Sequence, residues 1–359
     1  MNFNYRFPAI RGYQAGKEFF SIICPLDVLS KLFTFYNNEI PQEFRAQRVI
    51  NEKRIPEISN YILNNADNYV FSSITASIDG DYNFISSNNV DDNIGMLEVS
   101  MTSSLLINDG QHRKAAIDEA LNENPTLKNE SISVVLFVDQ GLKRSQQMFS
   151  DLNKHAVKVS KSLGILYNHR DPKIQFLKEF LDQNKEFNVI LDKSHDVIAK
   201  KSNKLFSLNN FNTAFERSYN HIELKDHNDL KKFVIDYWNY LSKDFKEWSF
   251  VINKESSAYH ARQNSVAVYG IVLESLALLC YYMYSENITS WKSTLRKLNK
   301  IDWCKSNQDD WLNRCMLENG SMHKSTKFIY RTYYRIKELL DFELTESELA
   351  HDQDLRKEV

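Results

Sequence analysis

LLINDGQHRKAAIDEAL, residues 105–121, is the stretch that decides the fold of the N-terminal half of this chain. Residues 105–107 are apolar and residues 114–121 resemble a helix, so the sequence predicts a strand that turns sharply at Gly110 into a helix. Glycine can adopt positive φ and can approach a ligand closely. A strand–glycine–helix turn of this kind presents backbone N–H groups to an anion.

The polar residues of the turn allow two interpretations. His112 and Arg113 would add an imidazole and a guanidinium beside the helix N-terminus, which suits a phosphate ligand. A purely structural interpretation is equally open, because Asn-Asp-Gly is a common turn, Asp109 could cap the helix, and Arg113 could be a solvated first-turn residue. The motif alone does not choose between the two.

The composition is that of an ordinary globular protein. The chain has 359 residues, 42% hydrophobic and 26% charged, which leaves room for two or three domains. It has 9 Gly and 6 Pro, which favours long helices over a many-stranded sandwich. The net charge of −2 does not indicate nucleic acid, so such a partner would have to bind a local basic patch.

The cysteines and the apolar segments indicate a cytoplasmic protein. Four cysteines without a CxxC pair are typical of reduced thiols, and no disulfide or metal site is predicted. Cys24 is the most plausible accessible thiol, although a small buried residue is the commoner role. The N-terminus lacks a signal-peptide pattern, and residues 265–285, which contain Glu274, are predicted to be a buried core helix. No membrane partner is expected.

The first half is predicted to be a compact α/β unit that ends near residue 165. Residues 17–64 are predicted to be mostly helical, and the polar residues 80–94 to be a loop. Residues 132–138 suit a central strand. The remaining predicted elements are strands at 70–78, 97–101 and 103–107 and a helix at 143–152.

The second half is predicted to be mainly α-helical. Residues 229–245 show the clearest apolar stripe at helical spacing. His260 and Arg262 precede the buried helix and are expected to cap it or to line a cleft. Further helices are predicted at 174–181, 208–219, 287–299 and 327–340. The predicted domains are residues 1–165, 166–342 and a charged, frayed C-terminal tail at 343–359.

Two further polar clusters could bind phosphate. In the first, Asn153 could orient a water or a phosphate and Lys154 could neutralise one, although a Lys- and His-rich helix C-terminus is the alternative. The second is a local excess of basic residues that could contact a DNA backbone, although such a run is usually a solvated face. Its candidate residues are Lys143, Arg144, Lys158, Lys161, Arg170 and Lys173.

Residues 292–337 are also rich in basic residues, and aromatic residues lie among them. The combination suits nucleic acid, although aromatics at helical spacing are more often core. These aromatic residues are Trp303, Trp311, Tyr330, Tyr333 and Tyr334.

Residues 109–113, followed by Ala115 and Ala116, resemble the signature of the DGQHR-domain family. Within that family the chain most resembles DNA sulfur modification proteins. The resemblance extends from about residue 40 to residue 340. Its other segments are FSDLNK at 149–154, VSKSL at 159–163, NKLFSL at 203–208, IDW at 301–303, the region of Trp311, and NG at 319–320.

The resemblance implies an α+β fold, with an α/β N-terminal domain similar to the ParB N-terminal domain and to sulfiredoxin, followed by a mainly α-helical C-terminal domain. In both relatives a turn at a helix N-terminus holds nucleotide phosphates. Carried over to this chain, the cradle would consist of Gly110, Gln111, His112 and Arg113. Asn153 and Lys154 would form a second phosphate and metal box, and a nucleoside triphosphate with Mg²⁺ would be the ligand.

Two departures limit what the resemblance implies. Gln111 stands where sulfiredoxin has its catalytic cysteine, so sulfinic-acid reduction is not supported. ParB has Glu and then Arg where this chain has Gln111 and His112, so its choice of nucleotide need not transfer.

Three functions follow as hypotheses. The first is a DNA-binding regulator of DNA phosphorothioation that represses the modification operon, with double-stranded DNA, other sulfur modification proteins and a second copy of the chain as possible partners. The second is a nucleotide-dependent switch or weak NTP hydrolase that acts on DNA. The third is an interaction scaffold in which the motif is only structural. No catalytic residue is identified.

Overall fold

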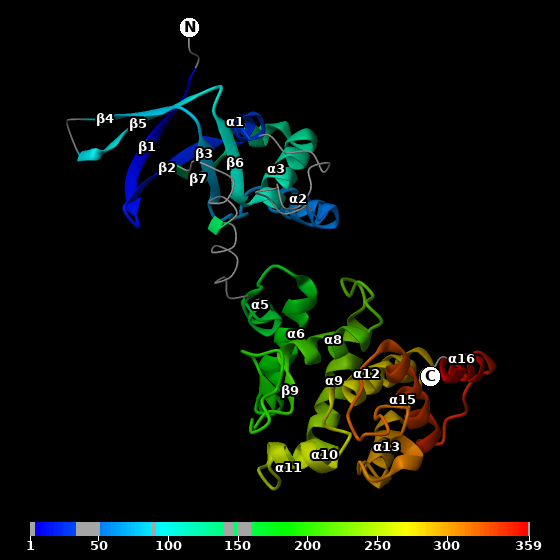
Figure 1. The fold of residues 1–359 in the computed structure, drawn as a ribbon. Coiled ribbons are helices and arrows are strands. Elements are labelled where there is room, and N and C mark those ends of the chain that lie inside the picture. Colours follow the sequence, from blue (N-terminus) through cyan, green and yellow to red (C-terminus); the bar gives the residue numbers. More distant parts are fainter. Residues whose placement is uncertain (1–3, 34–50, 88–90, 139–146, 149–158, 358–359) are drawn as a thin grey trace. The chain divides into compact units, whose positions relative to one another are not determined.

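The computed structural model describes residues 4–33, 51–87, 91–138, 147–148 and 159–357. A seven-stranded sheet with helices is followed by a mainly helical region (Figure 1), so the predicted succession of a sheet-containing and a helical part is confirmed. The chain divides into two compact units, Met1–Val157 and Lys158–Val359, and each has its own hydrophobic core. The predicted domain limits at residues 165 and 342 stay predictions.

The first unit is built on a mixed sheet with the strand order β4-β5-β1-β2-β7-β3-β6. Only β3 and β7 run parallel, and the other neighbouring strands are antiparallel. The strands are β1 (Asn4–Gln14), β2 (Lys17–Pro25), β3 (Ile74–Asp79), β4 (Tyr82–Ser87), β5 (Asp91–Ser100), β6 (Ser104–Asp109) and β7 (Ser131–Val138). The predicted central strand at 132–138 is therefore confirmed, because β7 has neighbours on both sides.

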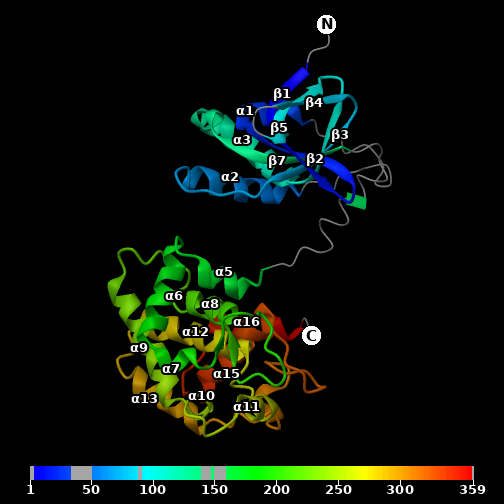
Figure 2. The ribbon, with the colours of Figure 1, turned by 90° about the vertical axis from the view of Figure 1, so that its left-hand side faces the viewer.

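Helices cover one face of this sheet (Figures 1 and 2). Alternate strand residues point to the same face, and on one face those of β1 and β2, such as Phe7 and Phe20, are buried. The ring of Phe20 packs against Tyr82 and Phe84 of β4. The helical elements are α1 (Leu26–Leu32), the 3₁₀ turn η2 (Glu52–Arg54), α2 (Ile55–Asn64), α3 (Gln111–Glu123) and the 3₁₀ turn η3 (Pro125–Asn129).

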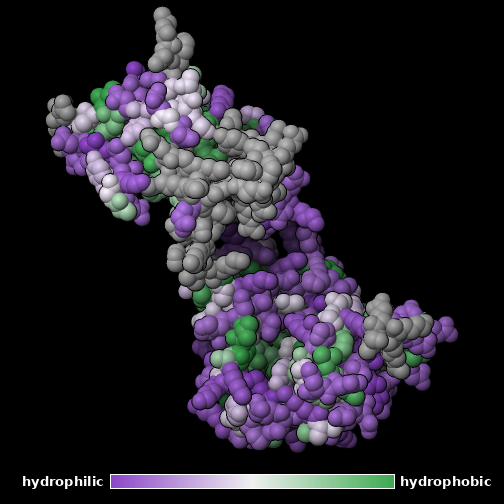
Figure 3. Space-filling view, viewed as in Figure 1, coloured by the Kyte–Doolittle hydropathy of each residue, from purple (hydrophilic) through white to green (hydrophobic). Residues whose placement is uncertain are grey.

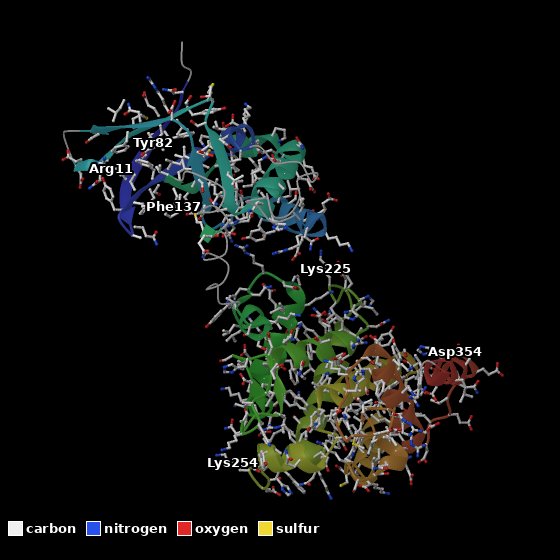
Figure 4. The ribbon with its side chains drawn as sticks, viewed as in Figure 1. Arg11, Tyr82, Phe137, Lys225, Lys254 and Asp354 are labelled. Carbon is white, nitrogen blue, oxygen red and sulfur yellow. The ribbon has the colours of Figure 1, made fainter. Side chains whose placement is uncertain are left out.

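The opposite face of the sheet exposes apolar side chains over β4, β5, β1 and β2. Ile10 pairs with Ile94 across β1 and β5, and Ile85 pairs with Met96 across β4 and β5. All four side chains are exposed. Phe137, labelled in Figure 4, lies opposite Phe19, with ring centroids 5.5 Å apart. Exposed apolar side chains thus gather on this face of the sheet.

Two predictions for the first unit are wrong. Residues 17–25 form strand β2 rather than a helix, because the turn at Ala15 and Gly16, both with positive φ, folds β2 back on β1. Residues 80–94 contain β4 and the start of β5 rather than a loop. β4 is an edge strand with alternate residues in solvent, so its polar composition is compatible with a strand.

The second unit surrounds the buried helix α12 (Gly270–Ser285). The predicted core helix is confirmed, and no helix in the described part of the chain is long and apolar enough to cross a membrane.

The face of this unit seen in Figure 3 is mostly hydrophilic. Its other elements are α5 (Lys161–Tyr167), α6 (Pro172–Gln183), α7 (Lys185–Asn188), β8 (Leu191–Asp192), β9 (Phe206–Ser207), α8 (Leu208–Arg217), α9 (Asn228–Asp244), α10 (Lys246–Ile252), α11 (Ala258–Asn264), α13 (Trp291–Arg296), η4 (Lys297–Lys300), α14 (Gln308–Trp311), α15 (Thr326–Leu339) and α16 (Glu346–Lys357).

The C-terminal segment is a helix, α16, where the sequence predicts a frayed tail. Its Glu348 accepts hydrogen bonds from the ammonium of Lys337, at 2.7 and 2.8 Å, and the Lys337 side chain is fully buried. Its His351 pairs with the hydroxyl of Tyr334 at 2.7 Å. A buried ammonium needs an anionic partner, so the ion pair between Lys337 and Glu348 holds α16 against α15. The sequence around residues 343–359 does not predict this pair.

Candidate phosphate-binding turn

Gly110 connects β6 to α3 in a left-handed conformation, with φ 112° and ψ 11°. A side chain is strained at this φ, and a Cβ added here would lie 2.9 Å from Cγ1 of Ile74 at the start of β3. The predicted strand–glycine–helix turn is therefore present, and it requires glycine for two independent reasons. No side chain caps the N-terminus of α3 among the described residues.

Arg113 clamps this turn to the chain that leads into β3. Its Nη2 donates to Asp109 Oδ2 at 2.7 Å, and its Nη1 donates to the carbonyls of Ser72 at 2.7 Å and Ser73 at 3.1 Å. The side chain is 15% exposed. The guanidinium thus ties the end of β6 to residues 72–73, and Asp109 pairs with Arg113 rather than capping α3.

Gln111 and His112 are also engaged within the fold. The side-chain amide of Gln111 is buried and donates to the carbonyls of Ile107 and Asn108, at 3.0 and 3.2 Å. Nε2 of His112 accepts from the backbone N–H of Asn51 at 3.0 Å, so in this arrangement the neutral ring carries its proton on Nδ1. The amide of Gln111, the imidazole of His112 and the guanidinium of Arg113 therefore all have partners within the fold.

Two polar contacts that support the turn were not predicted from the sequence. Lys114 pairs with Asp118 at 2.7 Å although its side chain is 6% exposed, and Asp118 also accepts from the hydroxyl of Ser30 on α1. The i,i+4 spacing of Lys114 and Asp118 is a signal that could have identified this pair. The second contact, from the Ser77 hydroxyl to Asn108 Oδ1 at 2.8 Å, is fully buried and has no sequence signal.

Asn153 and Lys154, which form the second predicted phosphate box, lie outside the described residues, and this box stays a prediction. Lys143, Arg144 and Lys158 of the predicted DNA surface lie outside them too.

The other three residues of the predicted DNA surface belong to the second unit. Lys161 and Arg170 are exposed, and Lys173 is partly buried. Lys161 begins α5, where its backbone N–H donates to Asp196 at 2.8 Å. Hydrogen bonds from the backbone N–H groups of Lys161 and Ser162 hold the pKa of Asp196 below its ordinary value.

The aromatic residues between 292 and 337 are mostly core rather than a stacking surface. Trp303 and Trp311 stack on each other, with ring centroids 4.8 Å apart, and both are buried. Tyr333 and Tyr334 are buried as well. Many of the cations in this region pair internally, and these pairs are Lys297–Asp341, Lys324–Glu274, Arg331–Asp352, Arg335–Asp310 and Lys337–Glu348.

Three of the four cysteines are buried in the structure. Cys24 is buried, as its commoner role predicts, and desolvation raises its pKa to about 12. Cys280 and Cys315 are buried too, and Cys304 is partly exposed. No three His, Cys, Asp or Glu side chains gather as metal ligands within the ranges that the structure describes.

Comparison with known families gives a match along almost the whole chain. A family model described as "DndB: DNA-sulfur modification-associated" matches residues 7–343. This range covers the turn at Gly110 and nearly all of the helical unit. No curated protein matches the chain, and no solved structure does.

Proposed function

The chain belongs to the DndB family of DNA-sulfur modification-associated proteins, and from this premise we propose that it is a DNA-binding regulator that represses the modification operon. The family match carries the proposal, since it implies involvement in a DNA sulfur modification system. Binding to double-stranded DNA and repression of the operon go beyond what the family implies and are our proposal. A cytoplasmic location would follow from them. The exposed Lys161 and Arg170 support a contact with the phosphate backbone.

A titration of the full-length protein against two fluorescent duplexes tests this function. One duplex carries the region upstream of the operon, and the other has the same length and a random sequence. A repressor binds its operator about a thousandfold or more tightly than random DNA at physiological salt. Equal affinities for the two duplexes would contradict the regulatory role, and the absence of binding to either would contradict DNA binding altogether.

A nucleotide-dependent switch, with possible weak NTP hydrolysis, is the second candidate. The observation that favours it is the left-handed Gly110, which turns the end of β6 into the N-terminus of α3. The backbone of residues 111–113 would hold phosphate oxygens. Mg²⁺ would accompany the nucleotide, and the half-exposed carboxylate of Asp109, which pairs with Arg113, is the acid that this turn could offer it.

Calorimetry with ATP, CTP and GTP, each with and without Mg²⁺, tests this candidate. His112→Glu adds a carboxylate that repels phosphate but suits the helix dipole, so we expect it to abolish nucleotide binding. Asn122→Glu makes the same kind of substitution in the last turn of α3 and should bind nucleotide like the wild type. Wild-type protein that binds none of the three nucleotides would remove the candidate.

We also propose a second copy of this chain as a partner for the apolar outer face of the sheet. The exposed Ile10, Ile85, Ile94 and Met96 support this proposal, because their burial would be favourable. Light scattering should show a dimer that becomes a monomer in the variant Ile10→Lys/Ile94→Lys. A monomeric wild type would contradict self-association and leave this face to another protein of the modification system.

A further inference from the structure

A loop of residues 193–205 joins β8 to β9 in the second unit, beside the β9 label in Figure 1. The loop contains no helix or strand, although β8 and β9 pair in parallel. Loops of this length without secondary structure of their own are uncommon in compact domains and are usually functional. The segment NKLFSL at 203–208, which carries part of the family resemblance, begins within this loop.

The first half of the β8–β9 loop is fastened to the N-terminus of α5. The Ser160 hydroxyl donates to the carbonyl of Ser194 at 2.6 Å, and the Ser162 hydroxyl donates to that of His195 at 3.1 Å. The Asp196 carboxylate accepts from the first two backbone N–H groups of α5, at 2.8 Å each. The Asp196 carboxylate therefore lies at a helix N-terminus, which favours its negative charge.

The second half of the loop is wrapped around the guanidinium of Arg262. This side chain is 9% exposed and donates to the carbonyls of Lys200 at 3.1 Å, Ser202 at 2.6 Å and Lys204. Lys305 in turn holds the backbone of Arg262, because its ammonium donates to the Arg262 carbonyl at 2.7 Å. Both halves of the loop thus have fixed backbones.

The charges that this fixed backbone presents outward are positive. Four lysines stand between residues 193 and 204, and Lys200 and Lys201 are exposed, with no ion pair to another described residue. The two nearby acids are occupied: Asp196 by α5, and Asp192 by the backbone N–H groups of Ser194 and His195, at 2.9 Å each.

We propose that the β8–β9 loop, together with the adjoining Lys161, is a contact surface for the phosphate backbone of duplex DNA. The inference rests on the proposed DNA-binding function and specifies its site. Charge complementarity supports DNA as the partner, and the anchored backbone lowers the entropy cost of presenting the lysines. Val197 is the one large apolar side chain of the loop that is mainly exposed, so the surface lacks the apolar anchors that membrane binding requires.

The salt dependence of DNA binding by the full-length variant Lys200→Ala/Lys201→Ala tests the proposal. Each phosphate contact contributes about 0.9 to the slope of log K against log salt, so two lost contacts lower the slope by about 2. Between 50 and 200 mM salt the wild type should then lose about tenfold more affinity than the variant does. The reduction should be the same for operon and random duplexes, since phosphate contacts carry no sequence information.

The matched control is Lys231→Ala/Lys232→Ala, which removes a lysine pair from α9 and should keep the wild-type slope. A method independent of variants is acetylation of surface lysines followed by mass spectrometry, in which bound duplex should protect Lys200 and Lys201 but not Lys232. The loop assignment would be overturned if the Lys200→Ala/Lys201→Ala variant kept the wild-type slope and bound duplex did not protect Lys200 and Lys201. The DNA-binding function would still stand in that case, provided that the wild-type protein binds DNA. Wild-type protein that binds no duplex would overturn both.

Discussion

The turn at Gly110 and the β8–β9 loop use their cations in opposite ways. In the turn, the motif residue Arg113 points back into the fold and donates to Asp109 and to two backbone carbonyls. In the loop, Arg262 performs the same task from a different element, and Lys200 and Lys201 remain in solvent. A guanidinium suits this role because its five donors have a fixed geometry. A recognisable motif therefore does not by itself mean that its charged side chains face a ligand.

The largest expected effect is on the turn itself. Gly110→Val should lower the free energy of unfolding of the first unit by about 3 kcal/mol, because it adds left-handed strain and a clash with Ile74. All five tryptophans lie in the second unit, so urea unfolding of the first unit is best followed by pulse labelling of the buried Cys24. Gly164→Ala in α5 is the control. A Cβ added at Gly164 meets open space, so this substitution should leave the free energy of unfolding unchanged or raise it.

Arg113→Ala tests whether the guanidinium is a clamp. We expect the first unit to lose about 2–3 kcal/mol, because the carbonyls of Ser72 and Ser73 and the Asp109 carboxylate lose their charged donor. Arg113→Lys keeps the positive charge and should lower the stability of the first unit by less than Arg113→Ala does. If Cys24 labelling gave Arg113→Ala the same free energy of unfolding as the wild type, the Arg113 side chain would be free for a ligand. The contrast between the inward-facing Arg113 and the exposed lysines of the loop would then disappear.

Arg262→Lys is the corresponding change in the loop, and its effect should be local. The variant should lose about 1.5–3 kcal/mol of hydrogen bonding to the loop carbonyls, so the loop should open more often. If the loop opens and closes faster than trypsin cuts it, the rate of trypsin cleavage after Lys200 and Lys201 should rise by about tenfold or more. Peptide mapping by mass spectrometry measures the rate. Cleavage after Lys232 in α9 serves as the internal reference, and an unchanged ratio would argue against the clamp.

Asp196→Asn should have the smallest effect, and one that depends on pH. The pKa of Asp196 is lowered from 3.8, so the folded state favours the carboxylate, and its contribution to stability is present above pH 3.8. This contribution is lost as the pH falls through the lower folded pKa. Tryptophan fluorescence should therefore show a lower melting temperature for the variant at pH 7, and a difference from the wild type that shrinks as the pH falls below 3.8. A difference that does not shrink as the pH falls would point to packing instead.

Local patterns predicted a good part of the fold. The junction of β6, Gly110 and α3 is predictable because an apolar run, a glycine and a helix-forming segment adjoin each other. The helices α9 and α12 follow from an apolar stripe and from an almost continuous apolar run. β2 was not predictable in this way, because its apolar residues become a strand only by pairing with β1 and β7.

By itself the sequence determined the family, the glycine turn at position 110 and the succession of a sheet-containing and a helical part, because each can be recognised from short local patterns in the chain. Only the tertiary structure decided which cations face inward. Arg113 finds its acceptors at residues 72–73, Arg262 at residues 200–204, and Lys337 finds Glu348 in the helix that replaces the expected tail. The physical reason is that burying a charge requires a partner, and these partners come from chain segments brought close only by folding.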